Sequence, residues 1–408
     1  MDFARSRRAL DSLRQSVLAT EPSLAIAACA VAGSAAAACA LWLASRYLGW
    51  ASDDRVANRA VVVCVGTAVP PNAGDNTQFR EVVSLMGYSP ATLSIVDKVI
   101  EKAGIETRHT VIADTPAEFV RCLVQSGPRA RASIWEKEAP LLAIAAARAA
   151  LARWHGGSAS RITHVVTHSC TGFMAPGVDH HLIVALGLRS STRKVGVHFA
   201  GCFGGFTALY VAKQIVEADS TGAAVVLVVC VEACTLHMSA VDQRVELVIG
   251  NTIFADGAGA AIVARADAAG VRSGGGAWVL GDMSSEVIPA SEGAMTWRSG
   301  GAEDGGAFKM WLDRSIPEVL SRTFATRGLG LLRRVGITSP WRCAWALHPG
   351  GAAIIRAFRR AFDTLRIKGD GLEASLDVLR DNGNMSSEFV QSDGAVTTTC
   401  GTVLPTNA

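Results

Sequence analysis

Three glycine-rich stretches carry residues that could do chemistry. Cys202 lies in "FAGCFGG", His348 in "ALHPGG" and Asn384 in "DNGNMSS". The cysteine follows an apolar run and precedes a helical pattern, so its thiol would lie at a helix N-terminus, where partial positive charge and free N–H groups stabilise a thiolate. Taken alone, however, the stretch is explained better by a small buried structural cysteine.

The histidine and the asparagine also have ordinary explanations when each is considered alone. His348 ends an apolar run, where catalytic residues gather in α/β sheets, yet a hydrogen-bonded loop histidine fits as well. Asn384 begins an Asn-Met-Ser glycosylation acceptor and equally fits a plain turn. Combined with Cys202, they suggest a Cys-His-Asn site. The histidine would form an ion pair with the thiolate, and both partners would donate hydrogen bonds to a thioester carbonyl or enolate.

Alternating strands and helices are the elements that must position these residues. Apolar runs predict strands at 60–70, 163–170, 194–202, 223–234 and 257–267, and helical spacing predicts helices at 139–154 and 206–218. A shorter series follows, with strands at 277–283 and 342–350 and helices at 315–328 and 351–362. Helices between buried strands predict a layered α/β architecture, built here from two similar halves.

Composition excludes several classes of protein. The net charge of +3 comes without a basic stripe interleaved with aromatic residues, so no nucleic-acid partner is expected. Ten cysteines without a C-x-x-C pair favour a reducing compartment over a disulfide scaffold. His180 and His181, with His168 and Cys170 upstream, lack a second ligand cluster at suitable spacing, so we predict no metal site.

The first 59 residues differ from the rest of the chain. Residues 22–45 carry no charge and are long enough to cross a bilayer as a helix, although alanine dominates them. A membrane anchor, an organelle-targeting peptide and a buried alanine-rich helix all fit this stretch. We take the anchor as the prediction, with the catalytic domain in the cytosol. The domains expected are then 1–59, 60–277 and 278–408.

Several ordered motifs make residues 60–387 resemble the type III polyketide synthases, the chalcone synthase family within the thiolase fold. They are "SCTGFMAPGVDHHLIVALGL", "GCFGGFTALYVAK", "VVCVEACTLHM", "FADGAGAAIV", "ALHPGGAAII" and "GNMSS". The resemblance implies two related βαβαβ halves in an α/β/α/β/α arrangement. It also implies a homodimeric acyltransferase that needs no cofactor. Such an enzyme condenses malonyl-CoA onto an acyl-CoA starter with decarboxylation, and then cyclises the product.

The same resemblance implies roles for individual residues. Cys202 would carry the acyl group, while His348 and Asn384 would drive decarboxylation and hold the enolate. Six further residues would surround the substrate: Cys170, Glu232, His237, Phe254, Phe308 and Ser386. The two phenylalanines match aromatic gatekeepers, Glu232 and Ser386 match a network that steers ring closure, and the cysteine and histidine replace pocket threonines. The small thiol favours a fatty acyl starter and an alkylpyrone or alkylresorcinol product.

Other positions depart from the family pattern. Ala175 stands where the family has a methionine that reaches into the partner subunit, and Lys102 and Arg108 are candidates for binding coenzyme A. After Ser387 the family's Gly-Phe-Gly-Pro-Gly loop is missing, which predicts an atypical, truncated C-terminal half. That departure leaves open a non-catalytic membrane-anchored homologue, and the predicted anchor leaves open an elongase-like 3-ketoacyl-CoA synthase.

Overall fold

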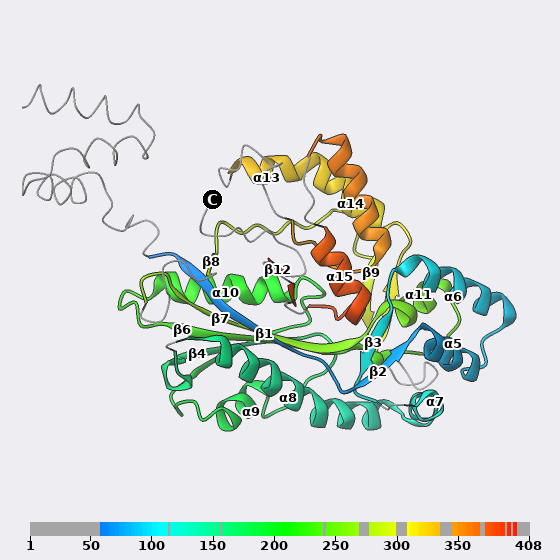
Figure 1. Cartoon of the computed structure of the whole chain (residues 1–408), viewed down its shortest axis with the longest axis horizontal. Coiled ribbons are helices and arrows are strands. Elements are labelled where there is room, and N and C mark those ends of the chain that lie inside the picture. The colour runs from blue at the N-terminus through cyan, green and yellow to red at the C-terminus, as the bar shows by residue number, and fades with distance from the viewer. Residues whose placement is uncertain are drawn as a thin grey trace, which may run out of the picture. The chain divides into compact units, whose positions relative to one another are not determined.

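A six-stranded sheet forms the centre of the fold (Figure 1). Its strands follow the order β5-β4-β6-β7-β1-β8. The bounds are β1 Ala60–Ala68, β4 His164–Ser169, β5 Arg193–His198, β6 Val225–Ala233, β7 Asp256–Arg265 and β8 Trp278–Val279. β4 runs parallel to β5 and β6, whereas β7 is antiparallel to β6 and β1. The five strands predicted between residues 60 and 267 are confirmed.

The computed structural model describes residues 58–112, 115–155, 157–239, 242–268, 277–298, 308–334, 345–367, 372–387, 390–392 and 395–397. The hydrophobic stretch 22–45 lies outside these ranges, so the predicted anchor has no structural account. None of the helices within them combines the length and the apolar character that crossing a bilayer requires.

Helices cover both faces of this sheet, which explains why its central strands are apolar on both sides. α8 (Pro128–Arg153) and α9 (Val178–Ala185) lie on one face, and α10 (Gly204–Ala218) lies on the other (Figure 1). Along β6, Leu227 and Val229 pack toward α8, while Val226 and Val228 pack toward α10. This alternation follows the two-residue period of a strand.

A group of shorter elements packs beside the sheet at the end of β1 (Figure 1). It comprises β2 (Asn72–Asp75), α5 (Asn76–Leu85), α6 (Pro90–Ala103), β3 (Thr107–Thr110), α7 (Pro116–Gln125), the 3-10 turn Cys234–His237, and α11 (Val245–Ile253). Another 3-10 turn, Ala159–Arg161, precedes β4. Side chains cap α5, α6 and α7. Asp75 and Gln78 form a reciprocal capping box on α5, and Thr115 caps α7.

The C-terminal part consists mainly of helices: α12 (Ile316–Thr323), a π-helical turn (Phe324–Gly328), α13 (Leu329–Arg334), α14 (Ala352–Thr364) and α15 (Glu373–Asn382). Two strand pairs accompany them, β9 (Met295–Arg298) with β10 (Lys309–Leu312), and β11 (Val390–Ser392) with β12 (Ala395–Thr397). The helices predicted at 315–328 and 351–362 are present, the first with its π turn.

The two strands predicted in this part are not reproduced as expected. The strand predicted at 277–283 is reduced to β8, which joins the first sheet by pairing with β1. Of the strand predicted at 342–350, residues 345–350 are described and form no named strand. Within the described ranges the second half therefore shows no sheet matching the first. Gly281, Asp282 and Pro349 interrupt runs that are too short to pair over their full length.

Candidate active site

Cys202 lies two residues before α10 and is partly buried. Gly201 adopts a left-handed conformation with φ 76°, which lets the chain turn sharply from β5 into the helix. The glycines after Cys202 permit close packing. A Cβ on Gly204 would lie 2.0 Å from the ring of His168, and one on Gly205 would lie 2.3 Å from the carbonyl oxygen of Ser387. The helix start predicted near residues 203–206 is confirmed.

Asn384 is buried and connects three segments. Its backbone N–H donates to the carbonyl of Ile253 at 2.9 Å, and its carbonyl accepts from Ala255 N at 3.0 Å. Its side-chain Oδ1 accepts from the backbone N–H of Ser386 at 2.9 Å, and Nδ2 donates to the carbonyl of Gly350 at 3.4 Å. The amide is therefore held by the loop that follows His348.

Ser386 joins this group to the cysteine. Its hydroxyl donates to Cys202 Sγ over 3.6 Å, and its backbone is left-handed with φ 61°. Gly350 packs tightly on the histidine, since a Cβ there would lie 2.8 Å from His348 Cδ2. A chain of contacts thus runs from Cys202 through Ser386 and Asn384 to the His348 loop. The fold therefore links Cys202 and Asn384 to the loop that follows His348.

Burial opposes charge on both the thiol and the imidazole. It raises the pKa of Cys202 to about 11, with the hydroxyl of Ser386 lowering it and the Glu232 charge raising it further. Burial also lowers the pKa of His348 to about 4, and no described residue forms a hydrogen bond with His348 Nδ1. The sequence predicted an ion pair, whereas these shifts favour a neutral thiol beside a neutral imidazole at pH 7.

Glu232, on β6, is fully buried and collects hydrogen bonds. Its carboxylate accepts from Cys170 N at 3.0 Å, Thr171 Oγ1 at 2.9 Å and Ser387 Oγ at 2.6 Å. The sequence assigned Ser386 to this network, but Ser386 faces Cys202 and the neighbouring Ser387 takes that place. Thr171 and Ser387 were missed because adjacent residues in an irregular turn give no pattern that tells which one points inward.

His237 lies between two aromatic rings and is fixed as a neutral tautomer. Its Nδ1 accepts from the backbone N–H of Phe308 at 3.2 Å, so Nε2 carries the proton and donates to the carbonyl of Thr171 at 2.6 Å. The rings of His237 and Phe308 lie 4.8 Å apart, and Trp297 approaches the histidine edge-on at 5.3 Å. Burial lowers the pKa of His237 to about 4. The predicted pocket residues Phe308 and His237 thus pack together in one aromatic group with Trp297.

Phe199 is a further member of this aromatic group, and the sequence did not reveal it. It directly follows β5, has a left-handed backbone with φ 54°, and packs edge-on against Phe308 with ring centroids 6.2 Å apart. Half of its surface remains exposed. A non-glycine residue with positive φ is uncommon, so the backbone here is strained three residues before Cys202.

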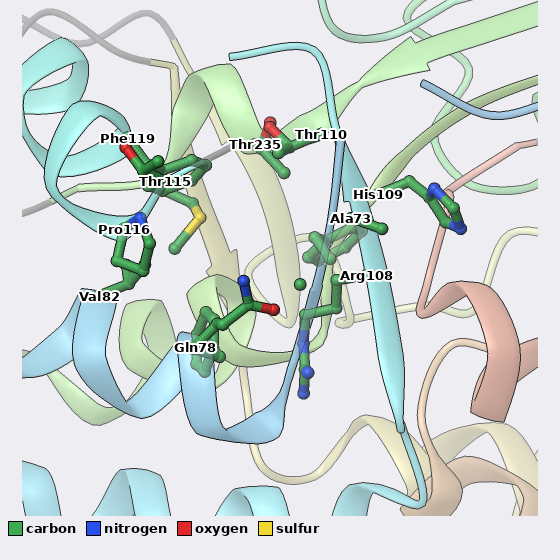
Figure 2. A pocket seen from close by; sticks show the side chains of 14 residues that line it. Ala73, Gln78, Val82, Arg108, His109, Thr110, Thr115, Pro116, Phe119 and Thr235 are labelled. Carbon is green, nitrogen blue, oxygen red and sulfur yellow. The ribbon is translucent and has the colours of Figure 1, made fainter. Parts of the chain in front are cut away.

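Phe254, at the end of α11, is buried and pairs through its backbone with Asn384 in an isolated parallel bridge. Its ring lines a cavity of about 60 Å³. Figure 2 shows Val82 and Phe119 on one side of this cavity and Arg108 on the other. The lining is mainly apolar, so the predicted gatekeeper separates an apolar cavity from the Asn384 segment.

Arg108 does not fit the predicted role in coenzyme A binding. It is buried, donating through Nε to the carbonyl of Thr252 at 2.8 Å and through Nη1 to Asn76 Oδ1 at 2.9 Å. Its guanidinium also lies over the ring of Phe79 at 4.7 Å. Burial lowers the pKa of Arg108 to about 10. Lys102, at the end of α6, is exposed and stays a candidate.

Comparison with known proteins agrees with this geometry. Residues 50–267 match the family model for the N-terminal domain of chalcone and stilbene synthases, and residues 280–391 match the model for the C-terminal domain. The fold is similar to the crystal structure of the C-terminal type III polyketide synthase domain of Steely1, a type I/III hybrid from Dictyostelium. The TM-score is 0.72 at 27% identity, covering 80% of this chain and 88% of that chain. The protein therefore belongs to the chalcone and stilbene synthase family, a family of acyltransferases with a thiolase-like α/β fold.

Proposed function

We propose that the protein loads an acyl group from coenzyme A onto Cys202 and extends it by iterative decarboxylative condensation with malonyl-CoA, followed by cyclisation. The observation that carries the proposal is the chain of contacts from Cys202 through Ser386 and Asn384 to the loop of His348. Family membership supports coenzyme A thioesters as the substrates. Malonyl-CoA and the starter are consumed as substrates, and the proposed steps use side chains alone.

Loading starts from the neutral pair. Because His348 has a low pKa and a free Nδ1, its imidazole is unprotonated at pH 7 and can accept a proton. As Cys202 Sγ attacks the thioester carbonyl, the thiol proton passes to the imidazole. The coenzyme A thiolate then leaves and takes that proton, so the products are acyl-Cys202 and free coenzyme A.

Extension requires stabilisation of an enolate. Loss of carbon dioxide from malonyl-CoA leaves two electrons on the thioester enolate, whose oxygen needs hydrogen-bond donors. Asn384 Nδ2 is available for this role, since its only recorded bond among the described residues is the long one to Gly350 O at 3.4 Å. The enolate carbon attacks acyl-Cys202, the C–S bond breaks, and the released thiolate takes up one proton from solvent.

A fatty acyl starter fits the chemistry of the surroundings. The cavity behind Phe254 is lined by Phe79, Val82, Phe119 and Met238, and apolar walls favour an alkyl chain. Cys170 supplies a small side chain beside the nucleophile, where its Sγ accepts from Gly201 N at 3.1 Å. We infer an alkylpyrone or alkylresorcinol type of product, as the family resemblance suggested.

We also propose that the active form is a homodimer joined along β5. This strand is at the edge of the sheet and is largely exposed, and a bare edge strand is prone to pair with another chain. Large apolar side chains are exposed nearby in the sequence, with Phe173 69% and Val184 68% exposed. Light scattering of wild type and Val184→Asp would test the proposal. A monomeric wild type would contradict it.

The N-terminal prediction stays a proposal: residues 22–45 anchor the protein, and the catalytic domain faces the cytosol. The support is the length and lack of charge of that stretch. Alkaline carbonate extraction of membranes would retain an anchored protein in the pellet. N-terminal sequencing that shows cleavage before residue 60 would favour the organelle-targeting alternative instead.

Intact mass spectrometry tests the central proposal most directly. Incubation with a fatty acyl-CoA should add one acyl mass to the wild type and none to Cys202→Ala, while Cys122→Ala, a cysteine outside the site, should still acylate. Wild type without an adduct would favour a non-catalytic homologue. With malonyl-CoA added and starters of varied length, linear β-ketoacyl thioesters would favour an elongase-like enzyme, and cyclised polyketides would support the proposal.

A further inference from the structure

His168, Cys170 and Glu232 meet in the interior, next to the proposed nucleophile. One ligand atom from each lies within 4.8 Å of the others, and all three residues are buried. The sequence predicted no metal site because no second ligand group followed the upstream histidine and cysteine. Glu232 on β6 supplies the missing ligand. β6 pairs in parallel with β4 and places Cys230, two residues before Glu232, opposite His168.

The imidazole of His168 presents a defined nitrogen to the other two groups. Its Nδ1 lies 2.7 Å from the carbonyl of Val197, which can only accept, so Nδ1 carries a proton. Nε2 then faces Cys170 Sγ at 3.6 Å and Glu232 Oε1 at 3.5 Å. Imidazole nitrogen, sulfur and carboxylate oxygen thus converge, and they need a proton or a cation between them.

The distances suit a metal ion. With metal–sulfur bonds of about 2.3 Å and metal–nitrogen or metal–oxygen bonds of about 2.1 Å, a tetrahedral zinc site separates N from S by roughly 3.6 Å and N from O by roughly 3.4 Å. The observed separations, 3.6 Å and 3.5 Å, agree with both values. A histidine, a cysteine and a carboxylate form a ligand set that zinc accepts.

The surrounding contacts are those that a metal site requires. Val197 O fixes the orientation of His168, and Ser387 and Thr171 hold the carboxylate of Glu232. Among the described residues, no lysine or arginine forms an ion pair with Glu232. A divalent cation bound by one thiolate and one carboxylate gives a neutral buried cluster, which avoids the cost of an unpaired interior charge.

We propose that His168, Cys170 and Glu232 form a binding site for a thiophilic divalent cation of the zinc class, and that the cation inhibits the enzyme. Binding releases the proton of the Cys170 thiol to solvent and forms the metal–sulfur bond. Inhibition follows from position. Gly201 N contacts Cys170 Sγ at 3.1 Å, and His168 packs where a Cβ on Gly204 would be, so the ligands surround the turn that carries Cys202.

Cobalt(II) is the probe that tests this site without relying on activity. The full-length protein, treated with a chelator and then titrated with Co²⁺, should bind one equivalent. It should show a thiolate-to-cobalt charge-transfer band together with the visible bands of a tetrahedral centre. Cys170→Ser should lose the charge-transfer band, and His168→Gln should weaken binding by at least about 100-fold, since it removes a direct ligand. His180→Gln is the matched control and should bind as the wild type does.

Several outcomes would overturn the proposal: no stoichiometric binding, a charge-transfer band that survives in Cys170→Ser, or a band lost in His180→Gln. Because His168 packs against α10, His168→Gln can fail to fold; its circular dichroism melt is therefore recorded first. If it fails, thermal stabilisation decides the matter. Zinc should raise the melting temperature of the wild type but not that of Cys170→Ser, and an equal rise in both would refute the site.

Discussion

The segment that holds Cys202 and the segments that hold His348 and Asn384 are built differently. Cys202 follows β5 of a six-stranded sheet covered by helices, and β6 in that sheet is buried at every residue. His348 and Asn384 instead lie in loops beside α14 and α15. The neighbouring elements are helices and short strands, each strand having two to four residues. Cys202 is therefore fixed by an extensive core, whereas His348 and Asn384 depend on a few local bonds.

Those local bonds can be named. The Asn384 backbone exchanges two hydrogen bonds with the Ile253–Ala255 segment, and the stretch before His348 is tied by Leu347 N donating to Ser375 Oγ at 3.0 Å. The packing of this part comes from an aromatic cluster that includes Phe324, Trp345 and Phe362. Stability and catalysis should therefore depend on different regions of the molecule. Damage to the sheet should unfold the protein, whereas damage to the loops should abolish catalysis and leave the fold intact.

The largest effect is expected from Asn384→Ala. Loss of the Nδ2 donor should lower kcat by about 1,000-fold, as measured for removal of one oxyanion donor elsewhere. The fold should lose only about 1–2 kcal/mol, because the side-chain hydrogen bonds to Ser386 N and Gly350 O disappear. Steady-state product formation and urea unfolding measure the two effects. Asn382→Ala, at the end of α15, is the control. A large loss of stability with unchanged kcat would contradict the division.

Gly66→Ala should do the reverse and damage the fold. A Cβ at Gly66 would lie 2.1 Å from the backbone nitrogen of Ala150 in α8, and neither backbone can move cheaply. We expect the free energy of unfolding to fall by about 3 kcal/mol, the upper range for overpacking. Gly281→Ala in the C-terminal part is the matched control, since no atom lies within 4 Å of its Cβ position. Equal urea midpoints for the two variants would refute the comparison.

The buried histidines make stability depend on pH. Burial lowers the pKa of His237 from 6.5 to about 4, so its contribution is full above pH 6.5 and is lost as the pH falls toward 4. One pKa unit corresponds to about 1.4 kcal/mol, and partial exposure reduces the total, so we expect a loss of about 1–2 kcal/mol between pH 7.5 and pH 5 from this residue. Urea unfolding of wild type and His237→Gln at both pH values measures it.

His348 contributes to the pH dependence over the same range, between pH 6.5 and pH 4, but it lies in the C-terminal part of the molecule. Its pKa is also lowered to about 4 by burial, so His348→Gln should reduce the acid loss as well. His180→Gln, on the exposed surface, should keep the wild-type slope. If both buried variants lose stability on acidification as steeply as the wild type does, the pKa values of the two histidines are not lowered in the native protein, and burial does not oppose their charge.

The features that could be predicted from the sequence also differ between the sheet and the C-terminal loops. Long apolar runs such as 225–233 predicted the sheet correctly, because burial on both faces demands continuous apolar residues. The Cys202 turn was predictable because only glycine tolerates the approach of His168 and of Ser387 O. The choice between Ser386 and Ser387 was not, since one residue of offset in an irregular turn reverses which side chain faces Glu232.

The His168–Cys170–Glu232 cluster shows a second limit of the sequence. Two of its members are separated by one residue on β4 and its extension, but the third is 62 residues further along and arrives only through strand pairing. Register between parallel strands is set by the whole core and cannot be derived from local spacing. The prediction of strands in the C-terminal part was wrong for a related reason. Their apolar runs are too short to indicate which strand each one pairs with.

The smallest effect concerns the hydrogen bond between Ser386 and Cys202, where the two regions meet. Ser386 Oγ donates to Cys202 Sγ over 3.6 Å, a long bond to sulfur that lowers the thiol pKa. Ser386→Ala should therefore raise that pKa, with a loss on the order of 0.5 kcal/mol, or about a twofold slower alkylation by iodoacetamide at pH 9. The alkylation rate followed by mass spectrometry from pH 7 to pH 11 gives the titration, and exposed Ser84→Ala serves as control. If Ser386→Ala alkylates faster than wild type, the hydroxyl shields the sulfur instead of stabilising its thiolate, and the C-terminal loop acts on Cys202 by covering it.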